Sequence, residues 1–438
     1  MTETSPTFTR RDLLSSSLGA VAVGAAGAAL AQPSISLPTS SRELWQWVRT
    51  QPVLDLLVAY LDVASVGPTL RAAMAAEYRA RDAQSFSVAN FSDGHWVNET
   101  NRLASRVATF AGCEPDELQF TYGAGAALGL VAAGLDFAAG DEIITTNREH
   151  PAALSPWLVL ARRRGVTVKQ IELPAPMSGP EQALGLFAGA ITERTRAFAF
   201  SHINYADGVV MPVRELCDFA RQKGILSIVD GAQAIGMIDF ALRDLNCDFY
   251  ATCFHKWLGG SHGSGMLYVR RDMLDRLWPV APRGVDASPP IVTPTGSAGH
   301  TGAPAAIHKL GNIVPHAWPA LRGVEAAMEL QQQIGRARIE ARVRELAIYM
   351  RLRLQQLPNI ELLTPARPGL WAGILTFRAP GKSASEAAIS LIRGHRVHVR
   401  DIAWPGSGGG ALRASLHMFN THDEVEKLMQ GLAQVMRA

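Results

Sequence analysis

Two residues of the chain, Lys256 and Asp230, offer an amine and a carboxylate where α/β proteins commonly carry out chemistry. Asp230 ends the apolar run Ile225–Asp230, and His255-Lys256 directly follows the apolar run Asp248–Phe254. Both runs have the length of a buried strand. Because ligands gather at the carboxyl ends of parallel strands, the sequence predicts that this lysine and this acid face one site.

Two further strand ends are expected at the same edge of the sheet. His150 follows the run Asp141–Asn147, and the small-residue loop Gly123-Ala124-Gly125 follows the run Leu118–Tyr122 and precedes a helix. Backbone N–H groups of such a loop, at a helix N-terminus, can bind a phosphate. An acid, a lysine and a phosphate cradle are together what pyridoxal phosphate (PLP) requires of a protein.

The runs that carry these residues belong to a regular alternation of strands and helices that begins near residue 95. Helices expected over Ala152–Arg164 and from Pro212 to Gly224 separate further strands over Val166–Leu173 and Arg196–His202. Strands alternating with helices of about a dozen residues are typical of a parallel sheet covered on both faces. The pattern therefore predicts an α/β fold with a mostly parallel central sheet.

The regions before and after this alternation of strands and helices have other sequence patterns. Residues 32–90 mix proline, serine and helical patches, with helices expected over Arg42–Tyr60 and Leu70–Ala83. After about residue 310, long amphipathic helices alternate with short strands, which predicts a smaller α+β domain. Its expected elements are helices over Ala320–Gln333 and Arg336–Leu357, strands over Ile360–Leu363, Ala372–Arg378 and Val397–Arg400, and a last helix with a capping box of Thr421 and Glu424.

Residues 1–31 resemble a twin-arginine export signal. Arg10-Arg11 precede a weakly hydrophobic run rich in alanine and glycine, and Ala29-Leu30-Ala31 offers a small-x-small cleavage pattern. The alternatives are an uncleaved membrane anchor or a basic tail, but alanine and glycine make a poor anchor. We expect export of the folded protein to the periplasm by the twin-arginine machinery, with no stable membrane insertion after signal cleavage.

Composition narrows the partners of the chain. Among 438 residues, 42 Lys+Arg against 39 Asp+Glu leave a net charge of +3, which argues against nucleic acid as a partner. Four cysteines at 113, 217, 247 and 253 form neither a disulfide scaffold nor a metal-ligand pattern, so no metal is expected. A small-molecule substrate remains the expected partner.

The stretches Ser227–Gly236 and Phe254–Gly260 resemble those of class V aminotransferases of PLP fold type I. That family includes cysteine desulfurases and isopenicillin N epimerase-like enzymes, and the resemblance runs from about residue 90 to the C-terminus. It implies a seven-stranded-type central sheet in a large PLP-binding domain over 91–310. It also implies a small domain over 311–438, which the helical segment 32–90 joins.

The resemblance also implies roles for single residues around PLP. Lys256 would form the Schiff base and shuttle the proton at Cα, and Asp230 would keep the pyridinium nitrogen protonated. His150 would stack on the ring, and Gln233 would bond the ring hydroxyl or the Schiff-base region. His255 would hold the phosphate together with Gly123-Ala124-Gly125, a loop that lacks the hydroxyl residues many members carry there.

Three more residues are implied at the edges of the site. Asn204 resembles a polar turn near the ring oxygen, and Arg413 resembles the arginine that grips the substrate carboxylate at two points. Thr301, in His300-Thr301-Gly302, resembles a turn that reaches the phosphate of the partner subunit. The implied protein is a homodimer with shared active sites.

The reaction type follows less directly. Cysteine desulfurases carry a nucleophilic cysteine shortly before the carboxylate-binding arginine, and Asp401–Gly410 holds none. We expect aminotransferase-type chemistry on an amino acid or peptide-like metabolite, with an epimerase or a C–S or β-elimination lyase as alternatives. An NAD-dependent oxidoreductase using Gly123, Gly125 and Gly129, whose spacing misses GxGxxG by one residue, and a non-catalytic periplasmic binding protein also stay open.

Overall fold

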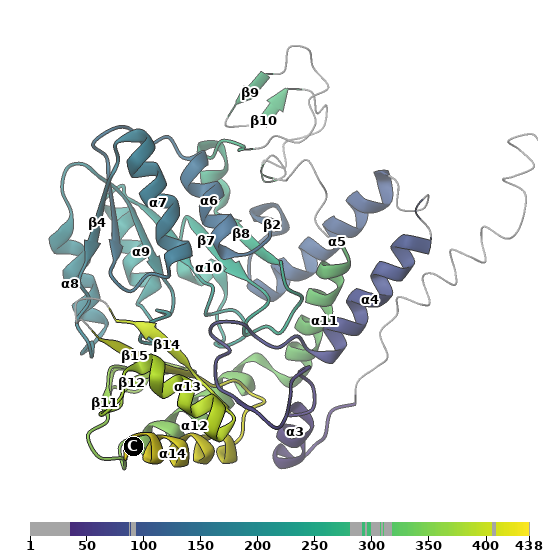
Figure 1. Ribbon diagram of the computed structural model, residues 1–438. Coiled ribbons are helices and arrows are strands. Elements are labelled where there is room, and N and C mark those ends of the chain that lie inside the picture. Colours follow the sequence, from purple (N-terminus) through teal and green to yellow (C-terminus); the bar gives the residue numbers. More distant parts are fainter. Residues whose placement is uncertain are drawn as a thin grey trace, which may run out of the picture.

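The structure is a computed structural model, and Figure 1 shows how its helices and strands are arranged. The segment 1–31, with the expected export signal, and Thr301 lie outside the described residues. The residues described are 36–86, 88, 93–280, 291–293, 296–298, 307, 310, 318–404 and 409–437.

A seven-stranded mixed sheet forms the centre of the larger part of the molecule (Figure 1). Its strands are β2 (Leu118–Thr121), β3 (Glu142–Thr146), β4 (Thr167–Ile171), β5 (Thr195–Ser201), β6 (Leu226–Asp230), β7 (Phe249–Cys253) and β8 (Gly265–Val269), in the order β2-β8-β7-β6-β5-β3-β4. The five strands β3 to β7 are parallel, and β8 is antiparallel to both of its neighbours. Two reversals leave β2 in the direction of β7, so the mostly parallel sheet is confirmed, with β8 an unpredicted insertion.

Helices cover both faces of this sheet, as the α/β pattern predicted. Strand β5 shows why, because Ala197 and Ala199 face one apolar core while Phe198 and Phe200 face the other. The first core is shared with α6 (Ala124–Gly134) and α7 (Pro151–Arg164), and the second with α5 (Asp93–Ala111), α8 (Pro180–Ala190) and α9 (Val213–Gln222). A strand buried on both faces needs apolar residues throughout, which is the run that the sequence presents.

A four-stranded antiparallel sheet, in the order β11-β12-β15-β14, organises the C-terminal part. Its elements are β11 (Glu361–Leu362), β12 (Ile374–Arg378), β14 (Arg400–Ala403) and β15 (Gly410–Ser415), with helices α12 (Arg336–Leu354), α13 (Ala384–His395) and α14 (His422–Val435). The capping box of Thr421 and Glu424 at α14 is confirmed. The single strand expected over Val397–Arg400 is wrong, because the chain changes partners there: β13 (Val397–His398) pairs with β1 (Ala59–Tyr60) and only β14 joins this sheet.

The N-terminal part contains α3 (Ser41–Val48), β1 (Ala59–Tyr60) and α4 (Arg71–Phe86). The helix expected over Arg42–Tyr60 is therefore too long. A residue before proline disfavours the helical conformation, and Pro52 instead forms an isolated bridge with Leu70. Strand β1 pairs in parallel with β13 of the C-terminal part, and α4 packs on α11 (Trp318–Ile334).

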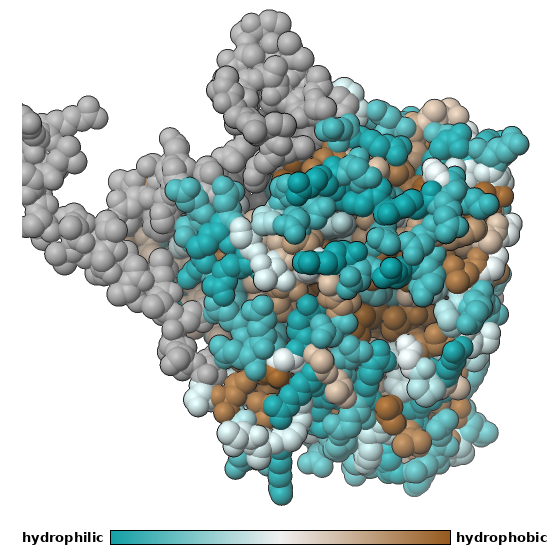
Figure 2. Space-filling view, turned by 180° about the vertical axis from the view of Figure 1, so that it is seen from behind, coloured by the Kyte–Doolittle hydropathy of each residue, from teal (hydrophilic) through white to brown (hydrophobic). Residues whose placement is uncertain are grey.

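The remaining short elements are the 3-10 turns Pro115–Glu117 and Arg271–Arg276, α10 (Leu242–Leu245), and the paired strands β9 (Ile291–Thr293) and β10 (Gly296–Ala298). On the face shown in Figure 2, hydrophilic residues cover most of the surface, and apolar residues form small separate areas. Within the described part of the chain, no helix combines the length and the apolar character needed to cross a bilayer.

Candidate active site

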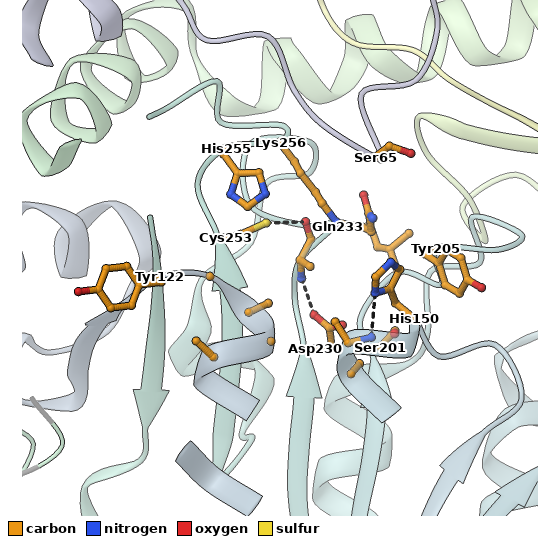
Figure 3. Close-up of a pocket in the computed structure, with 18 residues that line it drawn as sticks. Ser65, Tyr122, His150, Ser201, Tyr205, Asp230, Gln233, Cys253, His255 and Lys256 are labelled. Carbon is orange, nitrogen blue, oxygen red and sulfur yellow. Dashed lines mark hydrogen bonds between the residues drawn. The ribbon is translucent and has the colours of Figure 1, made fainter. Parts of the chain in front are cut away.

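A cavity of about 310 Å³ opens at the carboxyl edge of the seven-stranded sheet (Figure 3). Its walls come from the β2–α6 turn, the start of α7, the ends of β5, β6 and β7, and one N-terminal residue, Ser65. The predicted site residues that line it are Gly123, Ala124, Gly125, His150, Asp230, Gln233, His255 and Lys256. Gly123 and Lys256, which are 133 positions apart in the sequence, thus line one cavity because their strands end at one edge of the sheet.

Lys256 lies in the turn after β7 and extends into the cavity, and the next two residues, Trp257 and Leu258, are fully buried. The N-terminal segment supports this turn, because the Gly67 N–H donates to the carbonyl of His255 at 2.9 Å. A Cβ at position 67 would lie 1.9 Å from the carbonyl oxygen of Lys256. Only glycine allows this close approach, which holds the lysine backbone against the N-terminal segment.

Asp230 ends β6 at the floor of the cavity and is buried. Its Oδ1 accepts a hydrogen bond from the Ala232 N–H at 2.9 Å. Burial raises the pKa of Asp230, while the Ala232 bond and the positive charge of Lys256 lower it. A buried carboxylate in this position gains from a cationic partner, such as a protonated ring nitrogen.

The loop after β2 provides an anion cradle. Gly123 (φ +149°) is the N-cap of α6 and offers no side chain, so the first N–H groups of α6 stay available for a ligand. His255 lies beside Gly123, and its buried Nδ1 has no hydrogen-bond partner among the described residues. Burial, and then the charge of Lys256, lower the pKa of His255 to about 4. A phosphate would satisfy both sets of donors, so the residues present fit PLP.

His150 and Gln233 line the cavity with their polar groups already partly engaged. His150 caps α7, its Nδ1 accepting from the Ala152 N–H at 3.1 Å, and its ring meets Tyr205 edge-on at 5.0 Å between centroids. Burial, and then Lys256, lower the pKa of His150 to about 4. The Gln233 amide donates to the Ala64 carbonyl at 3.0 Å and accepts from the Trp257 indole at 2.7 Å.

Arg413 is not among the residues that line the cavity. Its guanidinium lies behind the wall, donating to Asp62 Oδ1 at 2.9 Å, to Ser65 Oγ at 2.6 Å and to the Tyr205 carbonyl at 3.0 Å. The Arg413 and Asp62 side chains are only 3% and 2% exposed. Burial raises the pKa of Asp62, but His398 and Arg413 outweigh it and lower the pKa overall. The arginine that the resemblance implies for the substrate carboxylate thus contacts two residues of the cavity wall but does not line the cavity itself. It is already paired with the carboxylate of Asp62.

Asn204 does not line the cavity either, which corrects its expected place near the ring. Its backbone forms a tight turn, accepting from the Gly208 N–H and donating to the Val209 carbonyl. The buried side chain is directed to Met211, with its Nδ2 4.0 Å from the sulfur. Its neighbours Ile203 and Tyr205 line the cavity instead.

Among the residues of the site that the sequence did not single out are Ser65, Asp62 and Tyr205. Ser65 and Tyr205 line the cavity, and Asp62 holds the arginine behind it. Asp62 and Ser65 lie in a segment without regular secondary structure, so no periodic pattern marks them. Their one signal is composition, since polar side chains interrupt the otherwise apolar stretch Leu61–Val66.

Cys253 lies at the end of β7 and lines the cavity. Its thiol donates to the Ala232 carbonyl at 3.7 Å, and burial raises its pKa to about 11. The other three cysteines are buried and free as well. A protonated, buried thiol is a poor nucleophile. Among the described residues, no group of histidine, cysteine and acidic side chains could hold a metal ion.

The chain is similar to known proteins of one family. The family model for aminotransferase class V matches residues 60–428. The chain is 32% identical to isopenicillin N epimerase of Amycolatopsis lactamdurans over 417 residues, covering 90% of this chain and 99% of that protein. It is 31% identical to cysteine desulfurase of Salmonella dublin over 357 residues, 78% of this chain and 82% of that protein. The fold is similar to that of the cystine C–S lyase C-DES, with a TM-score of 0.76 at 24% identity over 86% of this chain and 97% of that one.

Proposed function

The chain belongs to the class V aminotransferase family, whose members depend on PLP, and from this premise we propose that Lys256 moves a proton at the amino-bearing carbon of a small amino substrate. The outcome that we propose is aminotransferase-type chemistry on an amino acid or a peptide-like metabolite. The observation that carries the proposal is the cavity in which Lys256 faces Asp230 beside an anion cradle.

Each residue of the cavity has a task that its position supports. The N–H groups at the start of α6 and the unpartnered Nδ1 of His255 bind the phosphate of PLP. Asp230 holds a proton at the ring nitrogen, and His150 orients the ring. Bound PLP supplies the electron sink for the pair that remains when a proton leaves the amino-bearing carbon. Lys256 accepts that proton from the substrate and returns it.

Cysteine desulfurase chemistry is disfavoured for this chain. A desulfurase of the family attacks with a thiolate, and every cysteine here is buried and free. Cys253, which lines the cavity, has its pKa raised to about 11 by burial. The likeness to a desulfurase and to a C–S lyase therefore concerns the framework around PLP more than the attack on sulfur.

Epimerisation is the second candidate function. It is favoured by the likeness to isopenicillin N epimerase, which spans 99% of that protein. Epimerisation and transamination begin with the same proton removal by a base and differ in the atom to which the proton returns. The oxidoreductase and binding-protein alternatives leave Asp230 and Lys256 without a task.

The first experiment is incubation of the purified full chain with PLP. We expect a yellow protein whose visible band bleaches with borohydride, and peptide mass mapping should then place the cofactor on Lys256. A protein that stays colourless with PLP, or a change of absorbance with NADH alone, would overturn the proposal. Amino compounds in deuterated water then separate the reactions. Keto product with pyridoxamine phosphate indicates transamination, and deuterium at an inverted carbon indicates epimerisation.

The export route belongs to the proposal as well. The arginine pair Arg10-Arg11 and the pattern Ala29-Leu30-Ala31 support export of the folded protein to the periplasm. Replacing both arginines by lysine should leave the unprocessed protein inside the cell, as measured by fractionation and by the mass of the N-terminal peptide. Processing that is unaffected by the replacement would contradict this route.

We extend the proposal to a homodimer with shared active sites, on the resemblance carried by Thr301. Sedimentation of the PLP-loaded protein should give twice the chain mass at micromolar concentration. A monomer that retains full turnover would contradict shared sites.

A further inference from the structure

A second, much smaller cavity adjoins the floor of the active site at Asp230. It is lined by Leu128, Thr145, Glu149, Ala153, Trp157, Ala199, Phe200, Ile228 and Asp230. The space that the centre of a water-sized sphere can occupy is about 10 Å³. Asp230 lines both this cavity and the larger one, so any group held here acts on the carboxylate that we assign to the ring nitrogen.

Three of the lining residues are polar, and each is buried. The Thr145 side chain is on β3 and only 1% exposed, and its hydroxyl has no hydrogen-bond partner among the described residues. Glu149 accepts hydrogen bonds from Thr146 Oγ1 at 2.6 Å and from Ser201 Oγ at 2.5 Å. Asp230 accepts from the Ala232 N–H. The remaining lining residues are apolar, so they offer the Thr145 hydroxyl no alternative.

A buried space of this size with two to four polar partners is what a single ordered water requires. Leaving a buried hydroxyl unpaired is costly, whereas a bridging water satisfies it at little entropic cost. We propose that one buried water joins the Thr145 hydroxyl to the carboxyl groups of Glu149 and Asp230, and that Glu149 is thereby a positioning residue for Asp230. This inference rests on the proposed function only for its effect on PLP.

The charges around Glu149 set how the pair behaves. Burial raises the pKa of Glu149 to about 7, and the charge of Asp230 adds to this, while Ser201 and Thr146 oppose it. The groups that face Glu149 are Thr146 from β3, Ser201 from β5 and Asp230 from β6, with Tyr205 in the loop after β5. Helices α6 and α7 contribute only the apolar side chains of Leu128, Ala153 and Trp157.

Two carboxyl groups that share a buried site do not readily carry two negative charges. Below about pH 7, burial and the charge of Asp230 favour the neutral form of Glu149, which leaves Asp230 as the carboxylate that would face a protonated ring nitrogen. Above that pH, a second charge on Glu149 raises the pKa of Asp230 further. The protonation of the ring nitrogen therefore responds to Glu149 through the water and through the shared charge.

Infrared spectroscopy of the full chain, with and without PLP, tests the carboxyl network. The C=O band of a protonated buried carboxyl should disappear with a midpoint near pH 7, and Glu149→Gln should lack that band. Thr145→Val keeps the side-chain shape but removes the hydroxyl, and with it the water. Because the water stabilises the charged carboxylate, its loss should raise the midpoint by about one pH unit. Thr167→Val, on the exposed edge strand β4, is the matched control and should leave the midpoint unchanged.

An unchanged midpoint in Thr145→Val, or no carboxyl titrating near neutrality, would overturn the inference. A crystal structure adds a direct readout, since the water should be ordered in the parent chain and missing in Thr145→Val. With ¹⁵N-labelled PLP, the chemical shift of the ring nitrogen should change near pH 7 in the parent chain and stay flat in Glu149→Gln. If the chain does not bind PLP, the proposed function fails, but the infrared result still decides the water-linked pair.

Discussion

The two ends of the active-site cavity are built in different ways. At the end that we assign to the cofactor, Lys256, Asp230 and the Gly123 turn lie at the carboxyl ends of three strands of one sheet, and the helix dipole and backbone amides of α6 are available to bind an anion. At the substrate end, Ser65 and Arg413 come from an irregular N-terminal segment and from β15 of the other sheet.

The bonding of the charged groups differs as well. At the cofactor end, His255 Nδ1 has no hydrogen-bond partner among the described residues, and no side chain caps the first amides of α6, so these groups can bind a ligand. At the substrate end, the Arg413 guanidinium already bonds Asp62, Ser65 and Tyr205. The cofactor end is therefore open to an anion, whereas any carboxylate that bound Arg413 would compete with the carboxylate of Asp62.

The largest effect is expected at the cofactor end, for Lys256→Ala. Removing the base and the attachment point for PLP should lower turnover by at least about a thousandfold. Borohydride should then leave no cofactor fixed to the chain, as measured by peptide mass. Lys223→Ala, at the exposed C-cap of α9, is the control and should match the parent chain. Retention of fixed PLP in the Lys256 variant would show that another lysine holds it.

Asp230→Asn tests the same end with a side chain of equal shape. The amide cannot balance a protonated ring nitrogen, so turnover should fall by about a hundredfold while PLP still binds. The visible band should shift, because the ring loses its proton. Asp244→Asn, exposed on α10, serves as the control. Equal turnover in both variants would remove Asp230 from the chemistry.

The substrate end is tested by Asp62→Asn. If Asp62 competes for Arg413, its neutral form should let a carboxylate ligand bind on the order of tenfold more tightly. Calorimetry with amino acids and with the matching amines, which lack the carboxylate, separates this effect from a general change. Asp55→Asn removes the partner of Arg396 in an exposed ion pair and should change nothing. Weaker carboxylate binding in Asp62→Asn would instead make Asp62 a support that orients Arg413.

The two ends of the cavity also differ in how much of them could be predicted from the sequence. The cofactor end could be predicted because Asp230 and Lys256 each end an apolar run, and parallel strands end at one edge. The unpredicted strand β8 did not spoil this, since two reversals return β2 to the common direction. The α/β fold and its coverage on both faces followed from the same apolar runs.

The substrate end could not be predicted, because it depends on contacts across the whole chain. Asp62 and Arg413 are 351 positions apart, and no periodic pattern links them. The resemblance pointed to Arg413 but gave no sign of its pairing with Asp62. It also pointed to Asn204, whose side chain is directed to Met211 instead of the cavity, because a tight turn carries no repeat that would fix the register. The place of Thr301 stays a prediction.

As the pH falls, the stability that titrating groups contribute should be lost first at the cofactor end and then at the substrate end. Burial holds the pKa values of His150 and His255 at about 4, below their ordinary 6.5, so their unfolded forms bind protons more readily. The stability that their neutral forms provide is complete above about pH 6.5 and is lost as the pH falls toward 4. The pKa of Asp62 is lowered below 3.8, so its contribution is lost only below that value.

Urea unfolding from about pH 7 to pH 3 measures this order. His255→Gln should flatten the loss of unfolding free energy between about pH 6.5 and 4, because one proton-binding group is removed. In Asp62→Asn, the slope of unfolding free energy against pH should change mainly below about pH 4. This holds whatever the effect of the substitution on overall stability. A slope between about pH 6.5 and 4 that is the same in His255→Gln and in the parent chain would contradict the buried environment assigned to His255.

The smallest effect is expected at a helix start outside both ends. Helix α14 begins with Thr421, whose hydroxyl accepts from the Glu424 N–H, whereas α6 begins with Gly123 and has no side-chain cap. Thr421→Ala should lower the unfolding free energy by about 1 kcal/mol and leave the affinity for PLP unchanged.

Gly123→Ser, by contrast, would place a hydroxyl on the amides that the phosphate needs and should weaken PLP binding. Equal PLP affinities in the two variants would show that the amides of α6 do not hold the phosphate.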